Sequence, residues 1–495
     1  MRIVYIDIDT LRPDHLGCYG YHRDTSPNID RVAREGTRFE NCYVPDAPCL
    51  PSRAALHHGR FGIHNGAINH GGAHADPYNE GASRGFHNSD DYLQWVGVLK
   101  ENGFHNATVS SFAWRHHSWW FLAGFHEVYD CGKGGSEIAT EVTEKALEFV
   151  ERNKENDNWF LHFNNWDPHT PYRVPDEYGN PFADSPIASW VTQEMIDAQQ
   201  NTYGTHSANA TLHNPEGTPT SREVARITNL DDYKQWIDGY DVGIKFADDA
   251  VGRVLSKLEE AGLYEDTAII ISSDHGENQG ELNVYGDHQT ADRITCRVPM
   301  ILKWPGQAPR VDAGFHYQFD VAATILELVG AEVPAKWDAV SFKDAFLEGR
   351  DEGRDYLVVS QAAWSCQRSV VFDDFLLIRT YHDGLKDFPP VMLFDITNDP
   401  HELQNLADSR PDLVNRGLAL LQQWMDEQML TADVKEDPMM NVIEEGGPFH
   451  TRGRLELYLN YYRKIGRADI AERMERKYAG VPGASERDWS GALRN

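Results

Sequence analysis

The chain has 495 residues, of which 46 are Lys or Arg and 77 are Asp or Glu, and its formal net charge is −31. This acidity argues against sequence-independent binding to nucleic acid or to anionic membranes, because phosphate would be repelled by most of the surface. An anionic substrate therefore has to be met by a locally basic or metal-bearing site. With 41% hydrophobic and 11% aromatic residues, the chain can bury a large core. Its length predicts one large domain and a smaller one.

The first residues, 1–7, predict a strand and show no secretory pattern, and no apolar run is long enough to span a bilayer. We expect a soluble protein, either cytoplasmic or exported with a leader that this chain lacks. The cysteines form no CxxC pair, which is too sparse for a disulfide framework or a zinc finger. Free thiols are therefore expected at six positions: Cys18, Cys42, Cys49, Cys131, Cys296 and Cys366.

Short apolar strands alternate with amphipathic helices along the chain, a pattern typical of an α/β sheet covered on both faces. In chain order, we expect strand 2–8, helices 26–36, 90–102 and 137–153, strand 159–163, helix 231–262, strands 267–271 and 298–302, and helix 319–329. Pro299 should lie near the beginning of its strand, because proline cannot donate to a sheet. The polar stretch 206–222 is predicted to be a surface insertion.

Beyond about residue 354 the pattern changes to the short strands 356–360, 369–372 and 375–379, followed by a helix at 412–428. This predicts a smaller α+β module. The sequence thus predicts a catalytic domain over residues 1–354 and a C-terminal subdomain over 355–495, with a small sheet, a helix and a tail.

The most informative motif is the run 49–53, Cys-Leu-Pro-Ser-Arg. Its proline and serine suit the first turn of a helix, so Cys49 would precede a helix N-terminus, where free N–H groups favour an anion. Arg53 would add a permanent, forked cation. For the cysteine alone, a buried thiol would be the simpler interpretation. The whole run, however, resembles the C-x-P-S-R signature of the type I, formylglycine-dependent sulfatases of the alkaline-phosphatase-like superfamily, and Gly59 follows where that family has glycine.

The resemblance continues in the run 7–20, since sulfatases begin with a strand that ends in paired metal-binding acids. Asp9 matches the first acid, whereas Thr10 stands where many members have the second. Asp7 shares a side of the strand with Asp9, so it could supply the missing ligand. A capping or hydrogen-bonding role for Asp7 is equally open.

A second metal motif follows the apolar strand 267–271, where ligands of open α/β sheets gather. Asp274 and His275 resemble the Asp-Asn or Asp-His pair of sulfatases. Together with Asp9 and Cys49 they imply a metal site. An oxygen-rich set with one imidazole suits Ca²⁺, with Mg²⁺ as the alternative, better than structural zinc.

Further basic positions are implied by three more motifs. Residues 166–172 resemble the Pro-His-x-Pro string, whose histidine, here His169, contacts the sulfate ester. His288 stands where many members have Gly-Lys, and we expect it to replace the lysine as a general acid, which would make leaving-group protonation sensitive to pH. The usual Gly-Lys-Trp-His string is absent; Arg115 and His116 are predicted to take its Lys and His roles, with His117 as the competing choice.

The C-terminal part adds support without catalytic residues. Residues 393–406 resemble the family's C-terminal Asp-Pro-x-Glu-x-x-Asn-Leu string. The tail from Gly446, which includes His450 and Arg454, is either a solvated segment or a cover that folds over the substrate entrance. The resemblance as a whole predicts a large mixed, mostly parallel sheet flanked by helices, with a smaller C-terminal α+β subdomain.

The resemblance implies hydrolysis of a sulfate ester. Cys49 would be oxidised to formylglycine by a formylglycine-generating enzyme, and its hydrate would attack sulfur. Arg53 and the metal would hold the sulfate, His169 or His288 would protonate the leaving group, and His116 would act as the base. Neither nucleic acid nor a membrane is expected as a partner.

We expect a sulfated carbohydrate as the substrate, bound at a single sulfate group, because several tryptophans near the motifs could stack on a sugar: Trp114, Trp119, Trp120 and Trp166. Three alternatives stay open: a phosphonate monoester or phosphodiester hydrolase of the same superfamily, an N-sulfo-sugar sulfohydrolase, and a non-catalytic carbohydrate-binding descendant.

Overall fold

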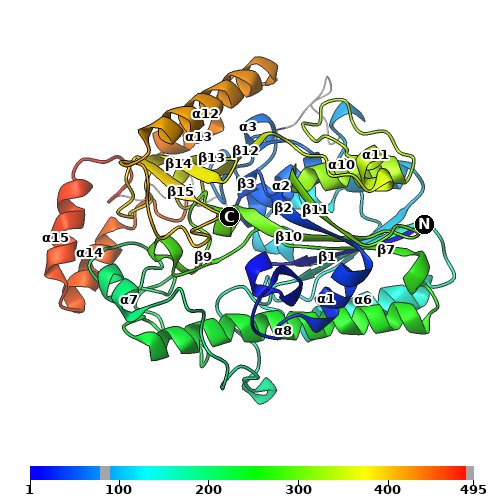
Figure 1. The fold of residues 1–495 in the computed structure, drawn as a ribbon, viewed down its shortest axis with the longest axis horizontal. Helices are drawn as coiled ribbons and strands as arrows, with labels where there is room; N and C mark the ends of the chain where they lie inside the picture. Colours follow the sequence, from blue (N-terminus) through cyan, green and yellow to red (C-terminus); the bar gives the residue numbers. More distant parts are fainter. Residues whose placement is uncertain (79–89, 486–495) are drawn as a thin grey trace.

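A computed structural model describes residues 1–78 and 90–485. Its main sheet has eight strands in the order β11-β2-β10-β7-β1-β6-β4-β5 (Figure 1). The strands β7, β1, β6, β4 and β5 run parallel, whereas β10 is antiparallel to both of its neighbours. The predicted large, mostly parallel mixed sheet is confirmed. Its bounds are β1 Arg2–Ile8, β2 Thr37–Tyr43, β4 His105–Val109, β5 Glu127–Tyr129, β6 Trp159–Asn165, β7 Thr267–Ser272, β10 Arg297–Lys303 and β11 Arg310–Tyr317.

Helices cover both faces of this sheet, as Figure 1 shows. Along β1, Val4, Ile6 and Ile8 join the core on the side of α1 Pro27–Glu35, α6 Ala139–Asn153 and α8 Leu230–Glu260. Ile3 and Tyr5 alternate with them and join the other core, with α2 Cys49–His58, α4 Trp95–Glu101 and α10 Gln318–Leu328. Since side chains alternate along a strand, Asp7 shares the side of Ile3 and Tyr5 and faces α2.

One sequence prediction needs correction in this sheet region. The helix expected at 90–102 begins only at Trp95, because residues 90–92 form a 3₁₀ turn and Gln94 is extended. Pro299 lies near the beginning of its strand, as predicted: it is the third residue of β10, and the pairing of β10 with β2 shifts register between Val298 and Met300. A proline in a sheet is tolerated at such an irregularity.

The C-terminal part contains a second sheet of five strands, in the order β15-β14-β13-β12-β3. The strands β12 Tyr356–Gln361, β13 Cys366–Phe372, β14 Phe375–His382 and β15 Val391–Asp395 are antiparallel, and α12 Pro411–Thr431 packs against them. The fifth strand, β3 Asp46–Ala47, comes from the N-terminal part and pairs with β12. This small sheet therefore holds the segment that directly precedes Cys49.

The last two helices, α14 Leu455–Lys464 and α15 Ala468–Lys477, share a small core with Tyr203 and Ala210. Tyr461 donates a hydrogen bond to the Asn209 carbonyl at 2.6 Å, and residues 203–211 are buried. The prediction of a surface insertion is therefore wrong for residues 206–211, because C-terminal helices that are distant in sequence cover them. The remaining elements are short: α3 Gly62–Asn65, α5 Phe112–Arg115, α7 Gln193–Gln199, β8 Asn278–Gln279, β9 Tyr285–Asp287, α9 Arg293–Cys296, α11 Lys343–Glu348 and α13 Pro438–Glu444.

All six cysteines carry free thiols, as expected. Within residues 1–78 and 90–485, no helix combines the length and the apolar character needed to cross a membrane.

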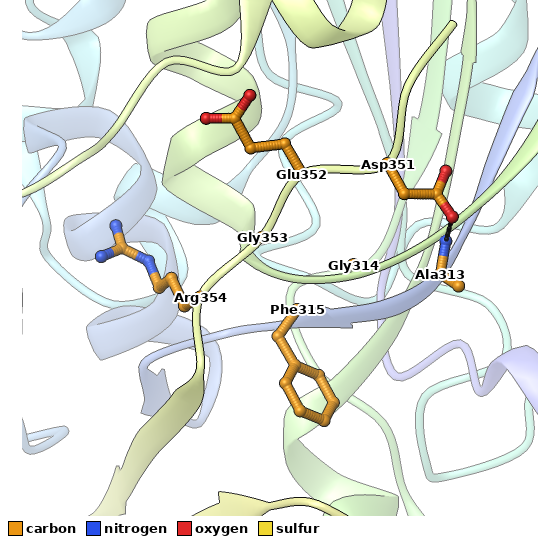
Figure 2. A pocket seen from close by; sticks show the side chains of 7 residues that line it. All are labelled: Ala313, Gly314, Phe315, Asp351, Glu352, Gly353 and Arg354. Carbon is orange, nitrogen blue, oxygen red and sulfur yellow. Dashed lines mark hydrogen bonds between the residues drawn. The ribbon is translucent and has the colours of Figure 1, made fainter.

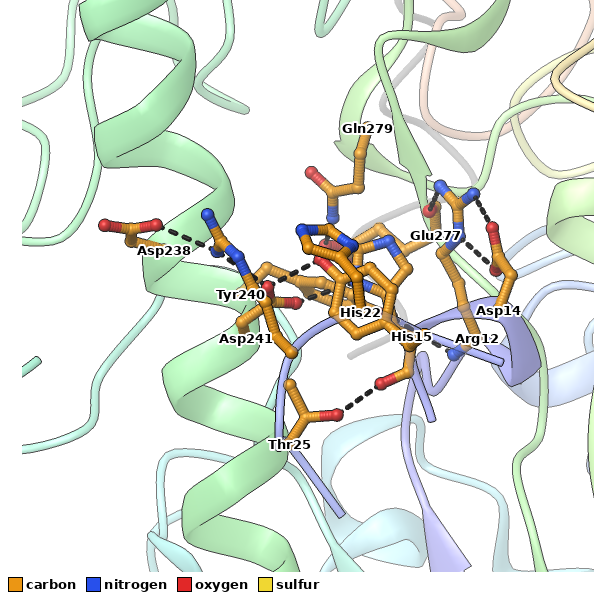
Figure 3. A network of polar contacts seen from close by, with 12 residues as sticks. Arg12, Asp14, His15, His22, Thr25, Asp238, Tyr240, Asp241, Glu277 and Gln279 are labelled. Atoms are coloured by element: carbon orange, nitrogen blue, oxygen red, sulfur yellow. Dashed lines mark hydrogen bonds and ion pairs between the residues drawn. The ribbon is translucent and has the colours of Figure 1, made fainter. Parts of the chain in front are cut away.

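The turn that follows β1 is held by a buried polar network (Figure 3). The guanidinium of Arg12 binds Asp14 at 2.6 Å and Glu281 at 2.8 Å, and Tyr240 of α8 donates to the Thr10 carbonyl at 2.7 Å. Removing one partner of such a buried pair typically costs about 3–5 kcal/mol. The network fixes the backbone directly after Asp9 relative to α8 and to the loop that follows β7.

Candidate active site

The carboxyl ends of β1 and β7, which are parallel neighbours, place three carboxylates around one guanidinium. Arg53 of α2 lies 2.9 Å from Asp7 Oδ2, 3.1 Å from Asp9 Oδ2 and 2.5 Å from Asp274 Oδ2. All four side chains are buried. The predicted residues Asp7, Asp9, Arg53 and Asp274 are thus brought together, and this cluster joins α2 to the sheet.

Cys49 is the first residue of α2, and its side chain is buried. Its Sγ lies 3.1 Å from Nε2 of His275, whose Nδ1 contacts the Gly276 carbonyl at 2.8 Å. Burial and the charges of Asp9 and Asp274 raise the pKa of the Cys49 thiol well above its usual value. The unmodified residue is therefore a protonated thiol and a poor nucleophile.

The ligand atoms of Asp9, Cys49, Asp274 and His275 all lie within 4.8 Å of one another. Oδ1 of Asp9 is buried and has no hydrogen-bond partner among the described residues. Burial and the Asp274 charge raise the pKa of Asp9 well above its usual value. A cation bound here would pair with this oxygen and relieve the repulsion, so the donor set fits a divalent cation.

Charge counting agrees with this fit. When ionised, Asp7, Asp9 and Asp274 exceed the Arg53 charge by two, which a divalent cation would neutralise. Asp7 lies outside the group of four, and its Oδ2 binds Arg53. The Arg53 charge and a hydrogen bond from His162 outweigh the effect of burial and lower the pKa of Asp7. Asp7 stays a predicted ligand through its unpaired Oδ1.

His169 and His288 lie beside the nucleophile position, because their ligand nitrogens and Cys49 Sγ are all within 4.8 Å of one another. His169 follows β6, and His288 directly follows β9. Burial and the charges of Arg115 and Arg173 lower the pKa of His169 well below its usual value. Burial and His275 do the same for the pKa of His288. Both imidazoles are therefore neutral in the free protein.

Arg115 and His116 lie at the end of α5, next to the same region. The guanidinium carbon of Arg115 lies 4.7 Å from the ring centroid of Trp166, and the charge of Arg115 acts on Asp9 and Cys49. His116 Nε2 is buried without a hydrogen-bond partner among the described residues. His117, the competing choice, is exposed.

The sequence predicts a supporting or structural role for His70, in a loop, 62–72, that could border the site, and the structure places it in contact with the residue after Cys49. The Leu50 amide N–H donates to His70 Nε2 at 3.4 Å, and His70 Nδ1 lies 2.8 Å from Nε2 of His450. The His450 ring stacks on Trp364, with centroids 4.4 Å apart. The tail thus reaches His70, which contacts the residue next to Cys49. A contact between residues 380 positions apart leaves no local signal in the sequence.

Arg173 is a residue that sequence reasoning missed. Its charge acts on His169, which lies four positions earlier in the same loop, so that spacing could have indicated it. The hollow in Figure 2, by contrast, is lined by residues 313–315 and 351–354 and contains none of the candidate active-site residues.

Comparison with known proteins identifies the family. The family model described as Sulfatase matches residues 2–331, two thirds of the chain. The chain belongs to the sulfatase family. It is therefore a sulfuric ester hydrolase of the alkaline-phosphatase-like superfamily. A further model, described as N-sulphoglucosamine sulphohydrolase, C-terminal, matches residues 280–431 of this sulfatase.

Individual relatives of this sulfatase differ in what they act on. An N-acetylglucosamine-6-O-sulfatase of Bacteroides thetaiotaomicron is 24% identical over 522 residues, covering 90% of this chain and 89% of the relative. A protein solved with its substrate D-glucosamine-2-N,6-O-disulfate has a TM-score of 0.69 at 20% identity, covering 88% and 99% of the two chains. A phosphonate monoester hydrolase of Silicibacter pomeroyi has a TM-score of 0.65 at 19% identity, covering 88% and 96%. These two structures show that the fold is shared.

Metal binding can be tested through thermal stability. Ca²⁺ at about 100 times its dissociation constant should stabilise the wild-type sulfatase by about 2.7 kcal/mol. Asp9→Asn should lose this gain, because it removes a predicted ligand, and should melt no lower than wild type without Ca²⁺, because burial already penalises the Asp9 charge. Melting curves with and without Ca²⁺ measure both effects.

The matched control is Asp312→Asn, which changes a buried aspartate that binds His316 at 3.1 Å on β11. This variant should keep the full Ca²⁺ shift. An unchanged shift in Asp9→Asn would contradict the assigned metal site.

Proposed function

We propose that this sulfatase hydrolyses a sulfate ester on a sulfated carbohydrate, with a nucleophile made by converting Cys49 to formylglycine. The observation that carries the proposal is the position of Cys49, at the start of α2 and within 4.8 Å of Asp9, Asp274 and His275. A thiol with a raised pKa would attack sulfate poorly and would leave a stable sulfur adduct. A formylglycine-generating enzyme is therefore the maturation partner that we propose.

The divalent ion that we propose is Ca²⁺, with Mg²⁺ as the alternative. Asp9, Asp274 and His275 would hold it together with residue 49, and the predicted ligand Asp7 lies beside them. When bound, the ion would supply fixed positive charge next to the oxygens of the sulfate group. Arg53 forms ion pairs with all three carboxylates and lies on α2. It would therefore fix the position of the bound ion relative to α2.

The proton transfers fall to histidines that surround residue 49. His169 or His288 would donate a proton to the leaving oxygen, because both lie within 4.8 Å of Cys49 Sγ. Both are neutral in the free protein, and the negative charge of a bound sulfate ester would favour their protonation. His116 would accept a proton from the hydrated residue 49, since its buried Nε2 has no hydrogen-bond partner in the described part of the chain. Arg115 would hold a sulfate oxygen.

A carbohydrate substrate is supported by the relatives that act on or bind sulfated glucosamines. The match to the C-terminal part of N-sulphoglucosamine sulphohydrolases favours an N-sulfo sugar as the second candidate substrate. The likeness to a phosphonate monoester hydrolase keeps phosphonate ester hydrolysis as the competing reaction. We favour sulfate, because the chain carries the sulfatase family match over residues 2–331.

The first test is the chemistry of residue 49. After co-expression with a formylglycine-generating enzyme, mass spectrometry of the peptide that contains Cys49 should show replacement of the thiol by an aldehyde. The matured protein should hydrolyse an aryl sulfate faster than the matching aryl phosphonate ester, and Cys49→Ala should be inert.

The control for this test is Cys131→Ser, which removes a partly exposed thiol on another loop and should mature and turn over normally. An unmodified Cys49 in an inactive protein would refute the proposed nucleophile, and a faster phosphonate reaction would favour the competing activity.

The second test concerns the general acid. Replacing His169 or His288 by Ala should slow hydrolysis of an alkyl or sugar sulfate by about 10²–10⁴-fold for the residue that donates the proton. The same variant should affect a nitrophenyl sulfate much less, because nitrophenolate leaves without protonation. Steady-state kcat values on the two substrates measure the difference. Equal losses on both substrates for both variants would contradict a role in leaving-group protonation.

A further inference from the structure

Two arginines next to the active site share one backbone acceptor. Arg115 donates to the Gly135 carbonyl at 3.3 Å, and Arg173 donates to the same oxygen. Gly135 has a φ of +85°, and a Cβ built there would lie only 2.6 Å from Arg115 Nη1. A side chain at this position would therefore displace the guanidinium. Arg173 also contacts the Thr170 carbonyl at 3.4 Å, so the pair is held by carbonyls of two loops.

Neither guanidinium has a carboxylate within 4.0 Å among the described residues, although the chain carries 77 acidic residues. The nearby acids are already bound to N–H donors. Asp167 accepts from the Ala139 amide at 2.9 Å, and Glu137 accepts from Trp166 Nε1 and from the Gly135 amide, each at 3.0 Å.

This arrangement leaves two partly buried positive charges side by side. Burial and the charge of Arg115 lower the pKa of Arg173, so the two guanidiniums repel each other. Partly buried charges that lack a partner cost free energy, which an anion between them would recover. The pair therefore has the charge and the free donors of an anion site.

The pair lies beside the reacting position. Arg173 and Nδ1 of His169 contact the same Thr170 carbonyl, and the ligand nitrogen of His169 is within 4.8 Å of Cys49 Sγ. The guanidinium carbons of Arg53 and Arg115 lie 5.8 Å and 4.7 Å from the ring centroid of Trp166, whereas Arg173 is held by the carbonyls of Gly135 and Thr170. An anion held by Arg173 would thus be adjacent to the sulfate that reacts, rather than being that sulfate.

We propose that Arg173 binds a second anionic group of the substrate, a sulfate or carboxylate on the same saccharide, and that Arg115 contributes N–H donors to this group as well as to the reacting sulfate. This assignment rests on the proposed function. Planar guanidiniums bind such groups with two parallel hydrogen bonds, which a single lysine cannot do. Trp119, which is 55% exposed, lies 5.8 Å from Trp114 next to Arg115 and offers an aromatic face to the sugar ring. The preferred substrate is a saccharide with two anionic groups.

The test compares glucosamine 2-N,6-O-disulfate with glucosamine N-sulfate and glucosamine 6-O-sulfate. We expect wild type to prefer the disulfate in kcat/KM. Arg173→Ala should lower the ratio of kcat/KM for the disulfate to that for the better monosulfate by about 10- to 100-fold, as expected for a charge-assisted contact. The ratio for Arg173→Lys should lie between those of wild type and Arg173→Ala, because lysine keeps the positive charge but cannot donate two parallel hydrogen bonds.

Arg222→Ala is the matched control, because Arg222 also donates only to carbonyls, those of Val174, Pro175 and Gly179. It should leave the substrate ratio unchanged. Melting curves of all variants show whether they are folded. An Arg173→Ala variant that is folded and loses activity on all three sugars equally would overturn the inference, because Arg173 would then act on the reacting sulfate or on the loop.

Binding separates failure of this inference from failure of the proposed function. If wild type turns over none of the three sugars, the proposed substrate class fails. Calorimetry with the Cys49→Ala protein then still compares the three as ligands. Tighter binding of the disulfate that Arg173→Ala abolishes would support the second anion site, and equal binding of all three sugars would overturn it.

Discussion

The ion pairs of Arg53 with Asp7, Asp9 and Asp274 are the interaction on which the site depends, because they join three separate parts of the fold. Asp7 and Asp9 end β1, Asp274 follows β7, and Arg53 stands on the second turn of α2. The parallel pairing of β1 with β7 brings the two strand ends to one edge of the sheet.

The same ion pairs fix the rotation of α2, so that its first residue, Cys49, meets His275.

Without a bound cation, this cluster lowers the stability of the fold. Three buried carboxylates share one guanidinium, and the pKa of Asp9 is raised by burial and by Asp274. A site built in this way gives up stability in the metal-free protein in return for a strong preference for a divalent ion. The turn after β1 cannot relax to relieve the repulsion, because Arg12 and Tyr240 hold it in place.

The geometry of the site shows how a chain with a net charge of −31 can bind an anionic substrate. The acids next to Cys49 are bound to Arg53 and form the proposed metal site, and on the side of His169 lie two arginines without carboxylate partners among the described residues, together with several neutral histidines. Neutral imidazoles can take up a proton when an anion binds, whereas guanidiniums provide permanent charge. Such an arrangement favours a compact anion bound next to Cys49 over a long polyanion that crosses the acidic surface.

The parts of the site that were predicted from the sequence are those in which local chemistry and position coincide. Asp9 and Asp274 each follow an apolar strand and lie in a recognisable motif, and Cys49 begins a helix within another motif. The structure brings the three residues together. His169, in the loop that follows β6, was predicted from a strand-end motif of the same kind, whereas His288 was predicted from its place in the family motif alone, since the short strand β9 before it was not predicted.

The parts that could not be predicted depend on contacts between distant segments. His70 meets His450 because the tail folds back to the site, and residues 206–211 are buried because both α14 and the segment 283–287 contact them. The strand β3 is two residues long, too short for a period-two pattern to reveal it. Arg173 differs, since it lies in a recognised loop, but the sequence does not reveal that no carboxylate of residues 1–78 and 90–485 pairs with it.

A crystal structure of the matured protein with Ca²⁺ and an uncleaved sulfate ester would test the proposed site directly. We expect one Ca²⁺ at about 2.3–2.6 Å from oxygens of Asp9, Asp274 and residue 49. The sulfur atom of the ester should face residue 49, with His169 or His288 next to the leaving oxygen. A metal ion bound elsewhere, or an ester whose sulfate lies away from residue 49, would contradict the proposed site.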